Sequence, residues 1–167
     1  THTRSFLKIQ DGCNSFCTYC IVPFARGREA SRSFEDVMEE VENLVKEGYS
    51  EITLLGQSVN SWGLEKLRIS TRKMLLRGEI NRAELPSNQS QYLQKEGLPP
   101  FVKLLQAISR FESIKVIRFL SSNPWDFHDE LIEEIACNPK IDRFIHLPVQ
   151  SGSNTVLKRM NRGYTRE

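Results

Sequence analysis

Apolar side chains recur at the spacing of an α-helix between residues 33 and 47. The recurring positions are Phe34, Val37, Met38, Val41, Leu44 and Val45. Because they fall three or four residues apart, they occupy one face of a helix and predict that this face is buried in a core. Ser33 is a typical N-cap and Gly48 is typical of a helix end, so the pattern predicts a helix between them.

Short apolar runs alternate with this helix and with further helical segments. Strands are predicted at residues 5–10, 51–55, 114–120 and 144–147. Helices are predicted at residues 33–47, 99–111, 126–136, where Asp126 would be the cap, and after residue 153. Each strand precedes a helix, which is typical of an α/β fold with a parallel sheet.

Residues 64–97 interrupt this alternation. Their helical spacing is patchy, basic residues outnumber acidic ones, and the segment from Pro86 to Gln91 has the composition of an open loop. A connection of this length inside a domain is usually functional or disordered. We interpret it as a solvated insertion in preference to a surface that contacts RNA, because charge runs are usually exposed faces.

Unusual polar residues follow the predicted strands at the point where each strand ends. They are Gly56, Gln57 and Asn60 after the second strand, Ser121, Ser122 and Asn123 after the third, and Gln150 and Ser151 after the fourth. Ligands of parallel sheets gather at the carboxyl ends of the strands. The pattern predicts one site at this edge, although each of these residues could instead cap a strand. His146, inside an apolar strand, is expected to be a core histidine with satisfied hydrogen bonds.

Three of the four cysteines, Cys13, Cys17 and Cys20, lie close together with the spacing C-x3-C-x2-C after the first strand. Thiolates are the usual ligands of iron–sulfur clusters, and three of them can hold three corners of a 4Fe-4S cube. The alternatives are a zinc site completed by a distant histidine or by Cys137, and a disulfide that would leave an odd cysteine. A lone cysteine is most often a small buried apolar residue, which is the interpretation preferred for Cys137.

The cysteine motif and its flanks resemble the radical S-adenosylmethionine (SAM) methylthiotransferases. Tyr19 supplies the aromatic residue that usually precedes the last cysteine, and residues 6–12 and 21–29 match the family around the motif. The stretches 54–60 and 146–153 are similar to the same family. They most resemble the branch that methylthiolates N6-isopentenyl-type adenosine in tRNA, over most of the chain except residues 64–97.

This resemblance implies a fold and its cofactors. Radical SAM cores are six-unit partial (β/α) barrels, of which this chain supplies about four units, so residues 1–167 are expected to be a core that is incomplete at its C-terminal side. Cys13, Cys17 and Cys20 would bind a 4Fe-4S cluster whose open iron holds SAM. The expected SAM contacts are Tyr19, Gly56, Gln57, Asn60, Ser121, Gln150 and Ser151.

The resemblance also implies partners beyond the chain. A second 4Fe-4S cluster and an RNA-binding domain are expected in the full-length protein, with tRNA as substrate and an electron donor such as flavodoxin or ferredoxin. This chain alone is not expected to transfer sulfur. The alternatives are a sister enzyme that acts on threonylcarbamoyl-adenosine in tRNA or on a ribosomal-protein aspartate, and a non-catalytic iron–sulfur module.

Composition adds modest limits. The 167 residues are 39% hydrophobic and 26% charged, which is ordinary for a globular domain with a core. No apolar run approaches the roughly 20 residues of a membrane span, and the first residues have no secretory pattern, so we expect a reducing, cytoplasmic location and no membrane partner. A net charge of +2 is low for a dedicated nucleic-acid binder, so most phosphate contacts should come from elsewhere.

Overall fold

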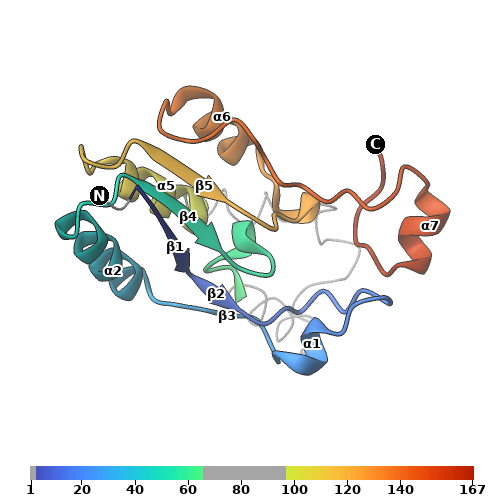
Figure 1. Cartoon of the computed structure of the whole chain (residues 1–167). Helices are drawn as coiled ribbons and strands as arrows, with labels where there is room; N and C mark the ends of the chain where they lie inside the picture. Colours follow the sequence, from blue (N-terminus) through green and yellow to red (C-terminus); the bar gives the residue numbers. More distant parts are fainter. Residues whose placement is uncertain (1–2, 66–96) are drawn as a thin grey trace.

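A parallel three-stranded sheet forms the centre of the chain (Figure 1). The computed structural model describes residues 3–65 and 97–167. Strand β1 (Arg4–Lys8) pairs with β4 (Glu51–Leu55), which pairs with β5 (Val116–Phe119). The predicted α/β fold with a parallel sheet is therefore confirmed.

Three helices cover one face of this sheet (Figure 1). They are α2 (Phe34–Lys46), α5 (Pro100–Ser109) and α6 (Asp129–Cys137). Alternate strand residues and helix residues meet in the core, which includes Leu7, Ile52, Leu54, Ile117 and Phe119 with Val37, Val41, Leu104 and Leu105. Each such fully buried side chain contributes roughly 1.5–3 kcal/mol before the entropy cost of ordering it.

Helix α2 follows its prediction closely. The Ser33 hydroxyl accepts a hydrogen bond from the Asp36 backbone N–H at 3.1 Å, which confirms the predicted N-cap. Val37 and Val41 are fully buried, whereas Phe34 in the first turn remains 39% exposed. The apolar face of α2 is therefore packed in the core over most of its length, but its first residue is not.

Helix α6 begins later than predicted. Asp126 does not cap it, because this residue is buried in the short 3-10 turn η3 (Pro124–Asp126), where its carboxylate accepts a hydrogen bond from the Ser61 hydroxyl. The N-cap of α6 is His128. Leu131 and Ile135 are buried on its inner face, whereas Ile132 is 48% exposed.

The predicted fourth strand does not form as a regular strand. Ile141 makes a single parallel bridge with Ile117, and the His146 carbonyl accepts a hydrogen bond from the Ser122 N–H at 3.1 Å. The chain from 141 to 146 thus runs beside β5 and touches it at its two ends. Phe144 between these points is 74% exposed, whereas Ile145 is partly buried against the core.

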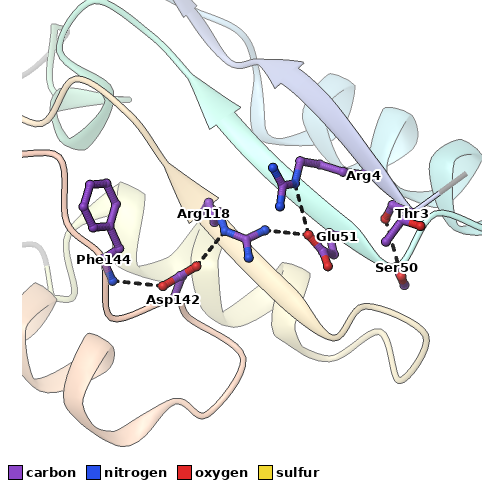
Figure 2. Close-up of polar contacts among 7 residues, drawn as sticks. All are labelled: Thr3, Arg4, Ser50, Glu51, Arg118, Asp142 and Phe144. Atoms are coloured by element: carbon purple, nitrogen blue, oxygen red, sulfur yellow. Dashed lines mark hydrogen bonds and ion pairs between the residues drawn. The ribbon is translucent and has the colours of Figure 1, made fainter.

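The face of the sheet away from the helices carries a row of charged side chains (Figure 2). Arg4 and Arg118 both contact the Glu51 carboxylate, at 3.1 and 2.6 Å. Arg118 also donates to Asp142 at 2.6 Å, so the row crosses all three strands and reaches the segment after Ile141. Arg4 and Glu51 are the first residues of their strands, at the end of the sheet opposite the edge where the predicted site residues lie.

The remaining elements lie near the carboxyl ends of the strands. The short antiparallel ribbon of β2 (Gln10–Asp11) and β3 (Ala30–Ser31) follows β1, and helix α1 (Val22–Ala25) lies between its strands. The 3-10 turn η1 (Val59–Ser61) follows β4, and α7 (Asn154–Arg159) precedes the last residues. Figure 1 shows α1 and α7 on the side to which the strand arrows point.

Most of the predicted insertion, residues 66–96, lies outside the described residues. Of its flanks, Leu64 is 2% exposed and packs in the domain, while Gly97 is exposed. In residues 3–65 and 97–167, no helix is both long enough and apolar enough to cross a membrane.

Candidate functional site

The cysteine loop is closed at its base by the ribbon of β2 and β3. Gly12 begins the loop with φ of +68°, and a Cβ at this position would collide with the backbone carbonyl group of Arg28. The Cys13 N–H donates to the Gly27 carbonyl at 3.2 Å, directly across the base. Only glycine combines this left-handed conformation with so close a backbone approach.

Cys13, Cys17 and Cys20 are free and half-buried on this loop. The Cys20 N–H donates to the Cys17 carbonyl at 3.0 Å, and the Ser15 N–H approaches the Cys13 sulfur at 3.4 Å. Within the described part of the chain, no three His, Cys, Asp or Glu side chains form a group that could hold a metal ion. Cys137 lies at the C-terminal end of α6 and is exposed, so its prediction as a buried residue is wrong.

Residues 159–164, hereafter the docking segment, contact the cysteine loop from the far end of the chain. The Thr18 N–H donates to the Met160 carbonyl at 3.2 Å, and its hydroxyl donates to the Arg159 carbonyl at 3.1 Å. Arg162 Nη1 donates to the Cys17 sulfur at 2.9 Å. Sequence reasoning did not identify this segment as part of the site.

Aromatic and apolar side chains surround the cysteines on the outer side of the loop. Tyr19 is 51% exposed and Phe24 is 75% exposed, and the rings of Phe16 and Phe24 meet edge to face with centroids 6.0 Å apart. Burial raises the pKa of the Tyr19 phenol, against the opposing effect of the nearby Arg162 charge. The loop therefore presents its thiols within an apolar rim.

The loops after β4 and β5 are joined to each other. The Val59 N–H donates to the Ser121 carbonyl at 3.2 Å. The Asn60 side chain is 2% exposed, and it donates to the Asn123 carbonyl at 2.8 Å and accepts from the Asn123 N–H at 2.7 Å. Asn60 thus uses both ends of its amide to clamp two strand ends together.

Gly56 packs against a buried side chain that the sequence did not single out. A Cβ on Gly56 would lie 3.0 Å from Gln10 Oε1, and that oxygen accepts a hydrogen bond from the Ser58 N–H at 3.3 Å. Gln10 Nε2 in turn donates to the Glu29 carboxylate at 3.2 Å. The absence of a side chain at Gly56 therefore makes room for Gln10, which connects the loop base to the end of β4.

Two of the predicted strand-end residues adopt the left-handed backbone region. Ser121 has φ of +65° and Gln150 has φ of +66°. The Ser121 N–H donates to His146 Nδ1 at 2.9 Å. His146 is exposed, so its predicted core location is wrong although its hydrogen bond is present. Non-glycine residues with positive φ are uncommon and often lie at functional sites.

Ser151 stabilises the turn that leads into α7. Its N–H donates to the Val149 carbonyl at 2.8 Å, and its hydroxyl accepts from the Ser153 N–H at 3.1 Å. The neighbouring Gln150 side chain is exposed at the same edge. This turn holds residues 149–153 next to the docking segment, because the Tyr164 hydroxyl donates to the Val149 carbonyl at 3.1 Å.

Buried polar atoms without a partner lie at this edge of the sheet. Gln57 Oε1, Ser122 Oγ and Trp125 Nε1 make no hydrogen bond to any described residue. Buried polar atoms in native structures are usually satisfied by protein, water or ligand. These three atoms follow β4 and β5, where the sequence predicts the bound ligand.

A pocket of about 370 Å³ lies between the cysteine loop, the loop after β5 and the docking segment. Its lining consists of Asn14, Ser15, Asn123, Trp125, Asn161, Arg162, Gly163 and Tyr164. The lining combines amide groups, two aromatic rings and one guanidinium. Such a surface suits a polar, planar ligand beside the cysteines.

Known proteins resemble the chain at the level of sequence. The sequence profile of the Radical SAM superfamily matches residues 7–167. The tRNA-2-methylthio-N(6)-dimethylallyladenosine synthase of Thermotoga petrophila is 47% identical over 164 residues, which is 98% of this chain and 30% of that protein. The enzyme of the same name from Carboxydothermus hydrogenoformans is 43% identical over 98% of this chain and 31% of its own length. The chain thus spans about a third of these curated relatives.

A solved structure resembles the chain at the level of fold. It is the radical S-adenosylmethionine methyltransferase TsrM from Kitasatospora setae, described with cobalamin and a 4Fe-4S cluster bound. It superposes with a TM-score of 0.53 at 18% identity, over 96% of this chain and 26% of that one. The superposition supports a partial α/β barrel and bears on the fold alone. The profile match over residues 7–167 shows that the chain belongs to the radical SAM superfamily.

Proposed function

We propose that this chain is the radical SAM core of a tRNA methylthiotransferase that modifies C2 of N6-isopentenyl-type adenosine. The observation that carries this proposal is the 47% identity to a tRNA-2-methylthio-N(6)-dimethylallyladenosine synthase over 98% of this chain. The sister methylthiotransferases and the non-catalytic iron–sulfur module have no observation in their favour.

The thiols of Cys13, Cys17 and Cys20 hold a 4Fe-4S cluster in this proposal. Three free, half-buried thiols on one loop fit the donor set of such a cluster, and the glycine at the loop base fixes their backbone. When bound, the cluster supplies the single electron for reductive cleavage of SAM to methionine and a 5′-deoxyadenosyl radical. The exposed rings of Phe16, Tyr19 and Phe24 supply apolar surface beside the thiols.

The protein's own residues bind and orient SAM at the carboxyl ends of the strands. Gln57 presents a buried oxygen without a protein partner, which suits the amino group of SAM. Gly56 and Asn60 hold the strand ends in place, and Tyr19, between Cys17 and Cys20 in the sequence, is a proposed contact of SAM. Ser121, Gln150 and Ser151 complete the proposed set of contacts.

The proposal extends to the larger assembly. Residues 1–167 form an incomplete core with an insertion at about 64–97, and the full-length protein adds a second 4Fe-4S cluster and an RNA-binding region. The substrate is tRNA, and a flavodoxin or ferredoxin supplies electrons. Cluster thiolates require a reducing compartment, which supports a cytoplasmic location. The chain alone cleaves SAM at most and does not transfer sulfur.

Anaerobic reconstitution tests the ligand set. The wild-type chain should take up close to four irons, and Cys13→Ala, Cys17→Ala or Cys20→Ala should each abolish this loading, because two thiolates retain a cube poorly. Cys137→Ala is the matched control and should load fully. Loss of iron in the control would show that the ligands are wrongly assigned.

A second measurement separates the enzyme from a structural module. The electron paramagnetic resonance spectrum of the reduced cluster should change when SAM is added, because SAM binds at the open iron. A spectrum that is indifferent to SAM would support the non-catalytic module. The tRNA substrate is then tested with the full-length protein, on tRNA that carries or lacks the N6-isopentenyl group.

A further inference from the structure

The docking segment holds one particular part of the cysteine loop. Asn161, with φ of +56°, directs its side-chain amide to the Phe16 carbonyl at 3.0 Å and to the Ser15 carbonyl at 3.4 Å. Thr18 adds its backbone and hydroxyl hydrogen bonds to the same segment. Because these contacts flank Cys17 on both sides, the segment fixes the backbone around this cysteine.

Arg162 extends the contact to the sulfur itself. Its Nη1 donates to Cys17 Sγ at 2.9 Å, and its Nε donates to the Tyr164 hydroxyl at 3.0 Å. The guanidinium carbon also lies 5.1 Å from the centroid of the Tyr164 ring, within the range of a cation–π contact. The Tyr164 hydroxyl donates in turn to the Val149 carbonyl.

This arrangement orients the guanidinium from two sides. Tyr164 takes one edge of the planar fork and leaves Nη1 directed at the sulfur, so the hydrogen bond to Cys17 costs little further ordering. The guanidinium keeps its proton under all ordinary conditions, so it remains a donor and a positive charge. Neither Cys13 nor Cys20 receives a comparable side-chain donor from any described residue.

Hydrogen bonds to ligand sulfurs are among the factors that set the potential of an iron–sulfur cluster. One-electron reduction adds negative charge to the cluster and its thiolates. A donor with a positive charge at one sulfur stabilises the reduced form more than the oxidised form, which raises the reduction potential.

We propose that Arg162 is a positioning residue that fixes the Cys17 thiolate and raises the reduction potential of the cluster, with Tyr164 holding its guanidinium in place. The proposal rests on the proposed function, since it requires a cluster on this loop. It also gives the docking segment a role in the electron-transfer step.

Potentiometric titration with dithionite, followed by electron paramagnetic resonance, measures this effect on the reconstituted chain. Arg162→Met should lower the equilibrium constant for one-electron reduction of the cluster about tenfold, which corresponds to a fall of about 59 mV in its reduction potential. Arg162→Lys keeps the positive charge but lacks the planar guanidinium, so its reduction potential should lie between those of Arg162→Met and the wild type. Tyr164→Phe removes the hydroxyl that orients Arg162 and should give a smaller shift in the same direction.

Arg166→Met is the matched control for net charge. The Arg166 side chain is 66% exposed, and its Nε donates to Glu167, away from the loop. This variant should keep the wild-type potential. Equal shifts in Arg166→Met and Arg162→Met would attribute the effect to overall charge and overturn the proposal.

The remaining outcomes separate this proposal from the proposed function. A wild-type chain that takes up no iron overturns both. A wild-type chain that loads fully, with an unchanged potential in Arg162→Met, overturns only the role of Arg162. If Arg162→Met takes up no iron, Arg162→Lys and Tyr164→Phe provide the test instead. A lower iron content with an unchanged reduction potential in both variants would show that the contact is purely structural and would overturn the proposal.

Discussion

Gly12, at the base of the cysteine loop, leaves no room for a side chain. It combines φ of +68° with a backbone carbonyl at the place a Cβ would occupy. Gly27, across the same loop base, has φ of +77° but nothing within 4 Å of its Cβ position. A substitution at Gly27 would therefore cause backbone strain alone, whereas a substitution at Gly12 would cause both strain and a steric collision.

Gly12→Ala should be clearly more destabilising than Gly27→Ala. The left-handed backbone costs an alanine about 1–2 kcal/mol at either site, and the collision with Arg28 adds to it only at Gly12. Denaturant unfolding of both variants measures the difference, and iron loading should fall in parallel for Gly12→Ala. Equal destabilisation of the two variants would mean that the loop base opens without cost.

Gly163 packs the docking segment against Trp125. A Cβ at Gly163 would overlap the indole ring, whereas a Cβ at Gly152 would meet nothing within 4 Å. Gly163→Ala should displace the ring at a cost of about 1–3 kcal/mol, as overpacking does, and Gly152→Ala should not. Trp125 fluorescence, read in a Trp62→Phe background, reports the displacement. An unchanged spectrum would show that the segment is not docked against this ring in solution.

At the scale of elements, the sequence predicts best what is encoded locally. Helix α2 is recoverable because its apolar period and its Ser33 cap lie within a few residues of each other. The prediction of a strand at 144–147 was wrong because the chain pairs with β5 by a single bridge at Ile141 and by the Arg118–Asp142 contact. It next bonds at His146 to the residues after β5, so no strand ladder continues through 144–147. Arg162 was missed because it lies 145 residues from Cys17, a separation that no local pattern records.

The charged row on the open face of the sheet is an element-scale feature with its own pH dependence. The Arg118 hydrogen bond holds the pKa of Glu51 below its usual range, with Arg4 in support. The Phe144 N–H and Arg118 lower the pKa of Asp142, against the opposing effect of burial. Because both pKa values are depressed, the row stabilises the folded chain above about pH 4, and this contribution is lost as the pH falls further.

Arg118→Met should therefore lower the melting temperature at neutral pH and make little difference near pH 2, where both carboxyl groups are protonated. Arg110→Met, at the exposed end of α5, is the control and should leave the pH profile unchanged. Thermal unfolding from pH 2 to 7 measures all three proteins. A constant difference between Arg118→Met and the wild type at every pH would show that Arg118 acts through packing alone.

At the scale of the whole molecule, the two faces of the sheet differ in kind. One face is buried under α2, α5 and α6, whereas the other leaves Phe6 62% exposed beside the charged row. In a closed barrel that second face would line the interior. The ring of Phe6 adds apolar area to any contact that this face makes with another molecule.

We therefore expect the chain to self-associate through this face, and Phe6→Thr to weaken the association. Threonine suits a strand, and Phe6 contributes little to the core, so the free energy of unfolding should change by no more than about 0.5 kcal/mol. Sedimentation velocity over a range of concentrations measures the association of both proteins. Phe24→Thr, beside the cysteine loop, is the control for exposed apolar area, because Phe24 is 75% exposed away from the sheet. If Phe24→Thr weakens association and Phe6→Thr does not, molecules meet through the rim of the cysteine loop, and the open face of the sheet is stable in water without a partner.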